Sequence, residues 1–157
     1  MTNAILGGWR FSPIATLHSG TPVNVVRGTN PASILPGLRP DVTGSPNVMT
    51  GHKTVFQWFN TGAFSVPKSI GGASFLPGDA GRNLVIGPGY GNLDTSVAKD
   101  FKVERLTINI RVEAFNTFNT PHYSNPDGDF NSGTFGQITS VQNGSNRLAQ
   151  LAAKFIF

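Results

Sequence analysis

The sequence contains no cysteine among its 157 residues. This absence excludes disulfide frameworks, thiolate metal sites and cysteine nucleophiles. Charge is also scarce, because Asp, Glu, Lys and Arg together make up 13% of the chain, about half of the roughly 25% that is usual in soluble domains. A coiled coil is excluded, because it would draw about half of its residues from Ala, Glu, Lys, Leu and Arg. A disordered, charge-rich tail is disfavoured too, since the chain holds 12 phenylalanines.

Long apolar runs and clusters of basic residues are missing as well. No stretch approaches the ~18 apolar residues of a transmembrane helix. The first eight residues lack the basic region of a signal peptide, so we expect either an intracellular protein or a chain whose first residue is not the natural start. The 12 basic residues are scattered and form no stripe with interleaved aromatics, so no nucleic-acid partner is expected.

What the chain does have is turn residues and alternation. It holds 19 glycines and 11 prolines, and four segments place apolar residues at every second position, which indicates half-buried β-strands. The clearest lies between about residues 106 and 118, where Leu106, Ile108 and Ile110 share one face. The sequence therefore predicts an all-β protein with strands at about 6–26, 91–101, 106–118 and 147–157.

The last of these segments is ambiguous. As a strand, it places Leu151, Phe155 and Phe157 on one face, whereas a helix would form a stripe from Leu148, Leu151 and Phe155. The terminal residues 154–157 favour the strand, which is our prediction.

The connections between the strands alternate between very short and very long. Residues of about 27–89 and 119–146 show no clear periodicity and far exceed the usual 4–6 residues of a loop. Within the first, the aromatic run 55–64 could anchor the segment. Strands of ~9–11 residues with alternating short turns and long outer loops are typical of transmembrane β-barrels. We therefore expect antiparallel up-and-down strands, a four-strand fragment of a large barrel with long extracellular loops.

Several motifs add a family resemblance. Residues 89–101 (GYGNLDTSVAKDF) and 110–121 (IRVEAFNTFNTP) resemble the C-terminal barrel of TonB-dependent outer-membrane receptors. Residues 8–12, 19–22 and 58–64 are similar, in the same order, to patterns of the Oar-like receptors that carry a carboxypeptidase-regulatory-like domain. The end of the chain, with Phe155 and Phe157, resembles the C-terminal signal read by the barrel-assembly machinery.

The resemblance implies a location, a function and partners. It implies the bacterial outer membrane and energy-dependent uptake of a scarce ligand, whose class (siderophore, cofactor, glycan or peptide) stays open. Such receptors have about 22 barrel strands, so it also implies a plug domain, further barrel strands and a TonB-contacting segment in a longer protein. Membrane lipid and the barrel-assembly machinery are further implied partners. No catalytic residue and no cofactor are expected.

Other candidate sites have simpler interpretations. Residues 125–131 (NPDGDFN) space oxygen ligands like a calcium loop, but the glycine and glutamate of an EF-hand are missing, so a polar turn is expected. The glycine-rich run 87–91 precedes a strand rather than a phosphate-binding helix. The three histidines, His18, His52 and His122, lack metal-ligand spacing, and no metal site is expected.

One charged pair stands out on the best strand. Arg111 and Glu113 lie two residues apart on its polar face. They are expected to form part of an ion-pair network in the barrel lumen, with contact to plug or substrate as the alternative. The competing hypothesis for the whole chain is a secreted or cell-surface β-sandwich with a binding or adhesive role. Its apolar strand faces would meet in a dry core instead of facing lipid.

Overall fold

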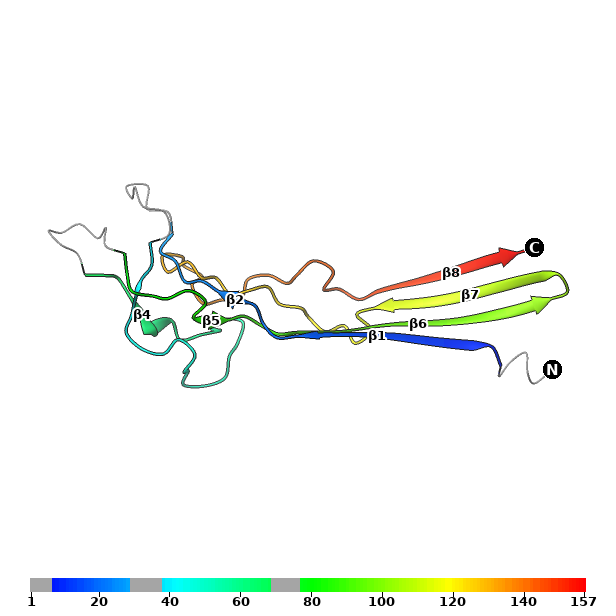
Figure 1. Ribbon diagram of the computed structural model, residues 1–157, viewed down its shortest axis with the longest axis horizontal. Coiled ribbons are helices and arrows are strands. Elements are labelled where there is room, and N and C mark those ends of the chain that lie inside the picture. Colours follow the sequence, from blue (N-terminus) through cyan, green and yellow to red (C-terminus); the bar gives the residue numbers. More distant parts are fainter. Residues whose placement is uncertain (1–6, 29–37, 69–76) are drawn as a thin grey trace. The chain divides into compact units, whose positions relative to one another are not determined.

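The computed structural model describes residues 7–28, 38–68 and 77–157. Its largest element is a four-stranded antiparallel sheet in the order β1-β6-β7-β8 (Figure 1). Every strand in this sheet pairs with the next one along the order, so the all-β, up-and-down arrangement is confirmed. The strands are β1 (Trp9–His18), β6 (Tyr90–Val103), β7 (Leu106–Phe115) and β8 (Leu148–Ile156). The last segment is thus a strand and not a helix.

The register of the sheet separates apolar from polar side chains. One transverse row is apolar throughout and consists of Phe11, Val97, Val112 and Leu151. The next row along the strands lies on the opposite face and contains Arg10 and Arg111. Because side chains alternate between faces with a period of two, the odd-numbered residues of β1, β6 and β8 share one face with the even-numbered residues of β7. The apolar face is open, with Phe11 65% and Leu151 73% exposed.

The first strand is shorter than the expected 6–26, whose first residue lies outside the described residues. β1 ends at His18, and Pro22–Val23 form a separate strand, β2, paired with β5 (Val85–Ile86). The break has a steric cause at Gly20, where a Cβ would lie 1.9 Å from the carbonyl oxygen of Gly87. Only glycine allows this close backbone approach.

The other strand ends differ by a few residues from the expected ones. β6 extends to Val103, so that only Glu104 and Arg105 form the turn to β7. Glu104 has a φ of 53°, which is the left-handed conformation used in tight two-residue hairpins. β7 ends at Phe115, earlier than the expected residue 118, because Asn116 also adopts a left-handed φ of 49°. Figure 1 shows the C-terminus at the same end of the sheet as the turn between β6 and β7.

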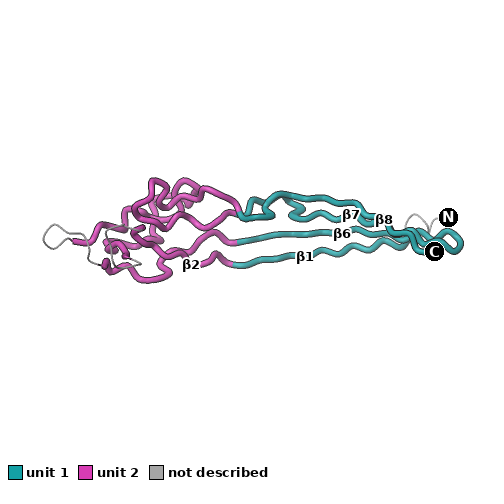
Figure 2. The backbone as a smooth tube through the Cα atoms, turned by 90° about the horizontal axis from the view of Figure 1, so that it is seen from above, with its two compact units in different colours: residues 1–18, 90–122, 142–157 teal, residues 19–89, 123–141 magenta. Residues whose placement is uncertain are grey.

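The two long connections, 27–89 and 119–146, contain short ordered elements and contribute to a compact unit. The chain forms two compact units: residues 1–18, 90–122 and 142–157 contain the sheet, and residues 19–89 and 123–141 form a second unit (Figure 2). The second unit holds β2 and β5, a further pair β3 (Asp41–Val42) and β4 (Phe64–Ser65), and the single-turn 3-10 helix η1 (Thr61–Ala63).

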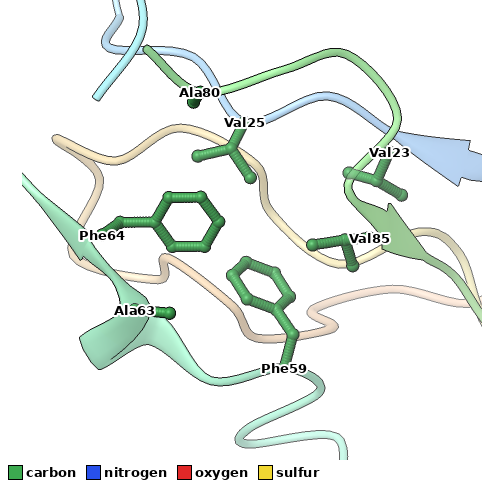
Figure 3. Packing of buried hydrophobic residues seen from close by; sticks show 7 residues of the cluster. All are labelled: Val23, Val25, Phe59, Ala63, Phe64, Ala80 and Val85. Carbon is green, nitrogen blue, oxygen red and sulfur yellow. The ribbon is translucent and has the colours of Figure 1, made fainter. Parts of the chain in front are cut away.

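The second unit has its own apolar core. Phe59 and Val85 are fully buried in it, and Phe135 packs edge-on against Phe59 with ring centroids 5.2 Å apart. As expected, the aromatic run 55–64 anchors the segment, since it supplies Phe59, Ala63 and Phe64. The buried members of this core are Val23, Val25, Phe59, Ala63, Phe64, Ala80 and Val85 (Figure 3).

The described residues contain no helix that is both long and apolar enough to span a membrane.

Candidate functional site

The polar face of the four-stranded sheet is hollowed into a groove of about 530 Å³. All four strands contribute to it, because the sheet register brings the even-numbered side chains of β1, β6 and β8 and the odd-numbered ones of β7 onto this face. Charged and hydroxyl groups dominate its lining. The lining residues are Arg10, Ser12, Ser96, Ala98, Asp100, Thr107, Asn109, Arg111, Lys154 and Ile156.

A first ion pair, extended by one hydrogen bond, links three strands across this groove. The Arg10 guanidinium on β1 contacts both carboxylate oxygens of Asp100 on β6, at 3.2 Å to Oδ1 and 3.1 Å to Oδ2. Asn109 on β7 donates a further hydrogen bond from Nδ2 to Asp100 Oδ1. Two-pronged contacts of this kind fix the geometry of both groups. Asp100 therefore has three polar contacts on the groove wall.

A second ion pair contains the two residues singled out by the sequence. Arg111 Nε lies 3.4 Å from Glu113 Oε1 on the polar face of β7. Gln150 on β8 donates a hydrogen bond from Nε2 to Glu113 Oε2. The structure thus brings Arg111 and Glu113 together and adds Gln150, which sequence reasoning missed. No signal in the sequence alone could have found Gln150, because its place opposite Glu113 depends on the register of β7 and β8.

A lysine on the apolar face was also missed. Lys99 is in register with Trp9 and Ile110 and is only 4% exposed. Its Nζ lies 4.6 Å from the Trp9 ring centroid and 5.2 Å from that of Phe101. These distances are typical of cation–π interactions. The signal in the sequence was its odd parity, shared with Val97 and Phe101.

Phe155 and Phe157 occupy the end of the sheet. Phe155 lies on the apolar face of β8 opposite Ile108. Phe157 follows the last residue of β8 and is almost entirely exposed. Both side chains are therefore accessible on the terminal strand, as a recognition signal would require.

The candidate calcium loop is held by the protein's own donors. Asp129 Oδ1 accepts hydrogen bonds from the backbone N–H of Gly28 at 2.8 Å and of Asn131 at 3.0 Å. Asp127 Oδ2 accepts one from the Thr134 hydroxyl at 2.7 Å. The loop therefore latches residues 28 and 129 together within the second unit. In the part of the chain that the structure describes, no group of three or more His, Asp or Glu side chains could hold a metal ion.

The pKa of Asp127 is set by burial and by hydrogen bonds within the same loop. Partial burial of the carboxyl raises the pKa, but the hydroxyls of Ser132 and Thr134 and the backbone N–H of Asp129 stabilise the carboxylate. The hydrogen bonds outweigh burial, and the pKa of Asp127 lies below its ordinary value.

Two of the three histidines come together in space. The imidazole of His18 stacks on the Tyr90 ring with centroids 4.8 Å apart, and that of His122 lies 4.1 Å from the same ring. His122 is buried, and its Nε2 lies 3.1 Å from the carbonyl oxygen of Gly91. The Tyr90 ring therefore lies in contact with both imidazoles, stacked on His18 and tilted against His122. His52 is exposed and belongs to the second unit.

The chain matches a family model described as an outer membrane beta barrel domain, over residues 1–150. No curated protein and no solved structure matches it.

Proposed function

Because this chain belongs to the outer membrane β-barrel domain family, and therefore to the bacterial outer membrane, we propose that its sheet is part of the wall of a TonB-dependent receptor. The receptor takes up a scarce ligand at the expense of energy supplied through the TonB system. In this arrangement the apolar face of β1, β6, β7 and β8 meets lipid, and the polar groove faces the lumen. We assign the chain no catalytic role and no cofactor.

The observation that carries the proposal is the segregation of the two faces of the sheet. An open apolar row containing Phe11 and Leu151 lies opposite the ion pairs Arg10–Asp100 and Arg111–Glu113. Lipid-facing strands alternate in this way, with the polar side chains turned to the interior of the barrel. In a β-sandwich the apolar row would be covered by a second sheet, whereas Leu17, at the end of β1, is 81% exposed.

The narrower assignment to TonB-dependent receptors is supported by the motifs. Residues 89–101 and 110–121, which carry the resemblance, build β6 and β7 and the turn after β7. The second unit, with its core around Phe59 and Val85, would then form part of the outer vestibule. The turn between β6 and β7 would face the periplasm, as short turns do in such barrels. Further barrel strands and a plug would come from the full-length protein.

The cheapest test is to extend the reading frame upstream of Met1. A receptor predicts further alternating strands, a plug domain and a signal peptide. The second step is an uptake assay on cells that express the full-length protein, with and without TonB. Uptake that persists without TonB would overturn the receptor assignment and leave the outer-membrane barrel intact. If the 157-residue chain is a monomer that folds cooperatively in water without detergent, the interpretation of the sheet as part of a barrel wall is overturned.

A further inference from the structure

The polar face of the sheet contains one lysine on an edge strand whose charge is unmatched. Lys154 on β8 stands in the same row as Asn109 and Asp100 and lines the groove. Asp100 is engaged by Arg10 and Asn109, and Glu113 by Arg111 and Gln150. Asp94, the third carboxylate on this face, accepts hydrogen bonds from Asn92 and from the backbone of Asn116.

None of the acidic side chains in the described part of the chain pairs with Lys154. Among the described residues it makes no hydrogen bond or ion pair with an acidic side chain. The segments outside the description, 1–6, 29–37 and 69–76, contain neither Asp nor Glu. The ammonium group of Lys154 is exposed on the edge strand and is free to pair with a carboxylate on an added strand.

The backbone of β8 lacks a hydrogen-bonding partner strand along its outer edge in the described part of the chain. In the described part of the chain β8 is the last strand of the sheet and pairs with β7 alone. Its outer N–H and C=O groups therefore need a further strand, because unpaired backbone groups are not tolerated in the hydrocarbon region of a membrane. Neighbouring strands of an up-and-down barrel run antiparallel, so the missing neighbour runs parallel to β7.

A second copy of the chain would be a poor neighbour. Within the four-stranded sheet of the described residues, the other free edge is β1, whose direction would suit the pairing. However, Arg10 on β1 lies on the polar face at the row of Ala98, two residues along β6 from the row of Lys154. Pairing β8 with β1 without a large offset would place the two cations close together, which is unfavourable for cross-strand neighbours.

We propose that β8 is completed by an antiparallel strand that carries Asp or Glu facing Lys154 on the lumen side. The inference rests on the proposed function, since this strand would come from the rest of the barrel. Lys102 provides the contrast: it also lies on the polar face, but on β6, which is separated from β8 by β7. A strand added at the free edge of β8 therefore reaches Lys154 and not Lys102.

The test uses the full 157-residue chain in detergent micelles and synthetic ten-residue peptides of alternating apolar and polar residues. One peptide carries Glu at its central polar position and the other Lys, and each has a Cys two residues away on the same face. The chain has no native cysteine, so Ala152→Cys, which lies on the polar face of β8, supplies the only thiol. Disulfide formation then reports strand addition at this edge.

We expect the Glu peptide to cross-link about three- to tenfold faster than the Lys peptide, as a favourable instead of a like-charged cross-strand pair implies. Lys154→Glu should invert the preference, and Lys154→Gln should abolish it. Lys102→Glu, the matched control, should leave the order unchanged.

Equal rates for the two peptides, or a preference that survives Lys154→Glu, would overturn the proposal. Rapid disulfide formation between chains carrying Ala152→Cys and chains carrying Ser12→Cys on β1 would overturn it as well, because a second copy would then fill the edge. The receptor assignment is judged separately by TonB-dependent uptake, so either inference can fail while the other stands.

Discussion

The side-chain amide of Asn116 donates a hydrogen bond of 2.7 Å from Nδ2 to the carbonyl oxygen of Ser145, 29 residues further along the chain. Asn116 follows the last residue of β7, and Ser145 lies shortly before β8. The same amide donates to the carbonyl oxygen of Thr120 at 2.8 Å and accepts from its backbone N–H at 2.9 Å. One buried side chain thus closes the turn after β7 and fixes the approach to β8.

Asn116→Gly should therefore destabilise the sheet unit. Glycine tolerates the left-handed φ of 49° at this position, so the substitution removes the amide without adding backbone strain. The carbonyl groups of Thr120 and Ser145 then lose a buried donor, and we expect a loss of about 2–4 kcal/mol. The measurement is the free energy of unfolding of the chain in micelles, by urea titration.

The matched control for this variant is Asn119→Gly. Asn119 also has a left-handed φ, of 53°, but its side chain accepts only an exposed hydrogen bond of 3.3 Å from the backbone N–H of Arg147. The loss should stay below about 1 kcal/mol. If both variants lose the same stability, the amide of Asn116 does not hold the two segments together.

Phe59→Ala should unfold the second unit locally. Phe59 is fully buried among Phe64, Phe135 and the valines of this core, and removing a buried phenyl ring costs about 3–5 kcal/mol. Hydrogen exchange of backbone amides in 38–68 and 77–89 should accelerate markedly. Phe56→Ala is the control, since Phe56 is 79% exposed, and its amides should exchange as in the unmodified chain.

The sequence was most informative where periodicity repeats. Alternation at every second residue predicts β1, β6, β7 and β8 and their two faces, because all four strands are extended and present one parity to each side. Boundaries were less accurate, because a close backbone approach at Gly20 and a left-handed conformation at Asn116 mark the strand ends. Both positions contact residues that lie far away in the chain, Gly87 for Gly20 and Ser145 for Asn116.

The second unit could not be predicted in the same way. Its core residues Val25, Phe59 and Val85 come from segments without regular spacing, so no periodic signal marks them. On the polar face of the sheet, Arg111 and Glu113 were found because they share one strand, whereas Asp100 was separated from Arg10 by 90 residues. Pairing across strands requires the register, which a single sequence does not provide.

The ion pair Arg111–Glu113 should contribute little to stability. The side chain of Arg111 is 53% exposed, and exposed pairs are worth about 0.2–1 kcal/mol. A double-mutant cycle with Arg111→Ala and Glu113→Gln, followed by urea unfolding in micelles, should give a coupling energy in this range. A coupling above about 2 kcal/mol would show that the pair is a structural element of the sheet rather than a solvated part of the groove wall.

The stability of the second unit should fall in acid because of Asp127. Its pKa in the folded chain lies below the ordinary value of 3.8, so the carboxylate stabilises the fold at pH values above about 4. This contribution is lost as the pH falls through the lowered pKa, since the unfolded chain then binds the proton more readily than the folded one. Unfolding can be followed by the fluorescence of Trp58 in a Trp9→Phe background, because the chain has only two tryptophans.

Between pH 5 and pH 3 the second unit of the unmodified chain should therefore lose more stability than that of the Asp127→Asn variant, whose amide does not titrate in this range. Thr134→Val should show a weaker pH dependence than the unmodified chain, because the hydroxyl that donates to Asp127 Oδ2 is gone. An Asp127→Asn variant with an unchanged pH dependence would assign the acid sensitivity to another group. In that case the link between Gly28 and Asp129, which contains a second carboxylate, would be the next position to substitute.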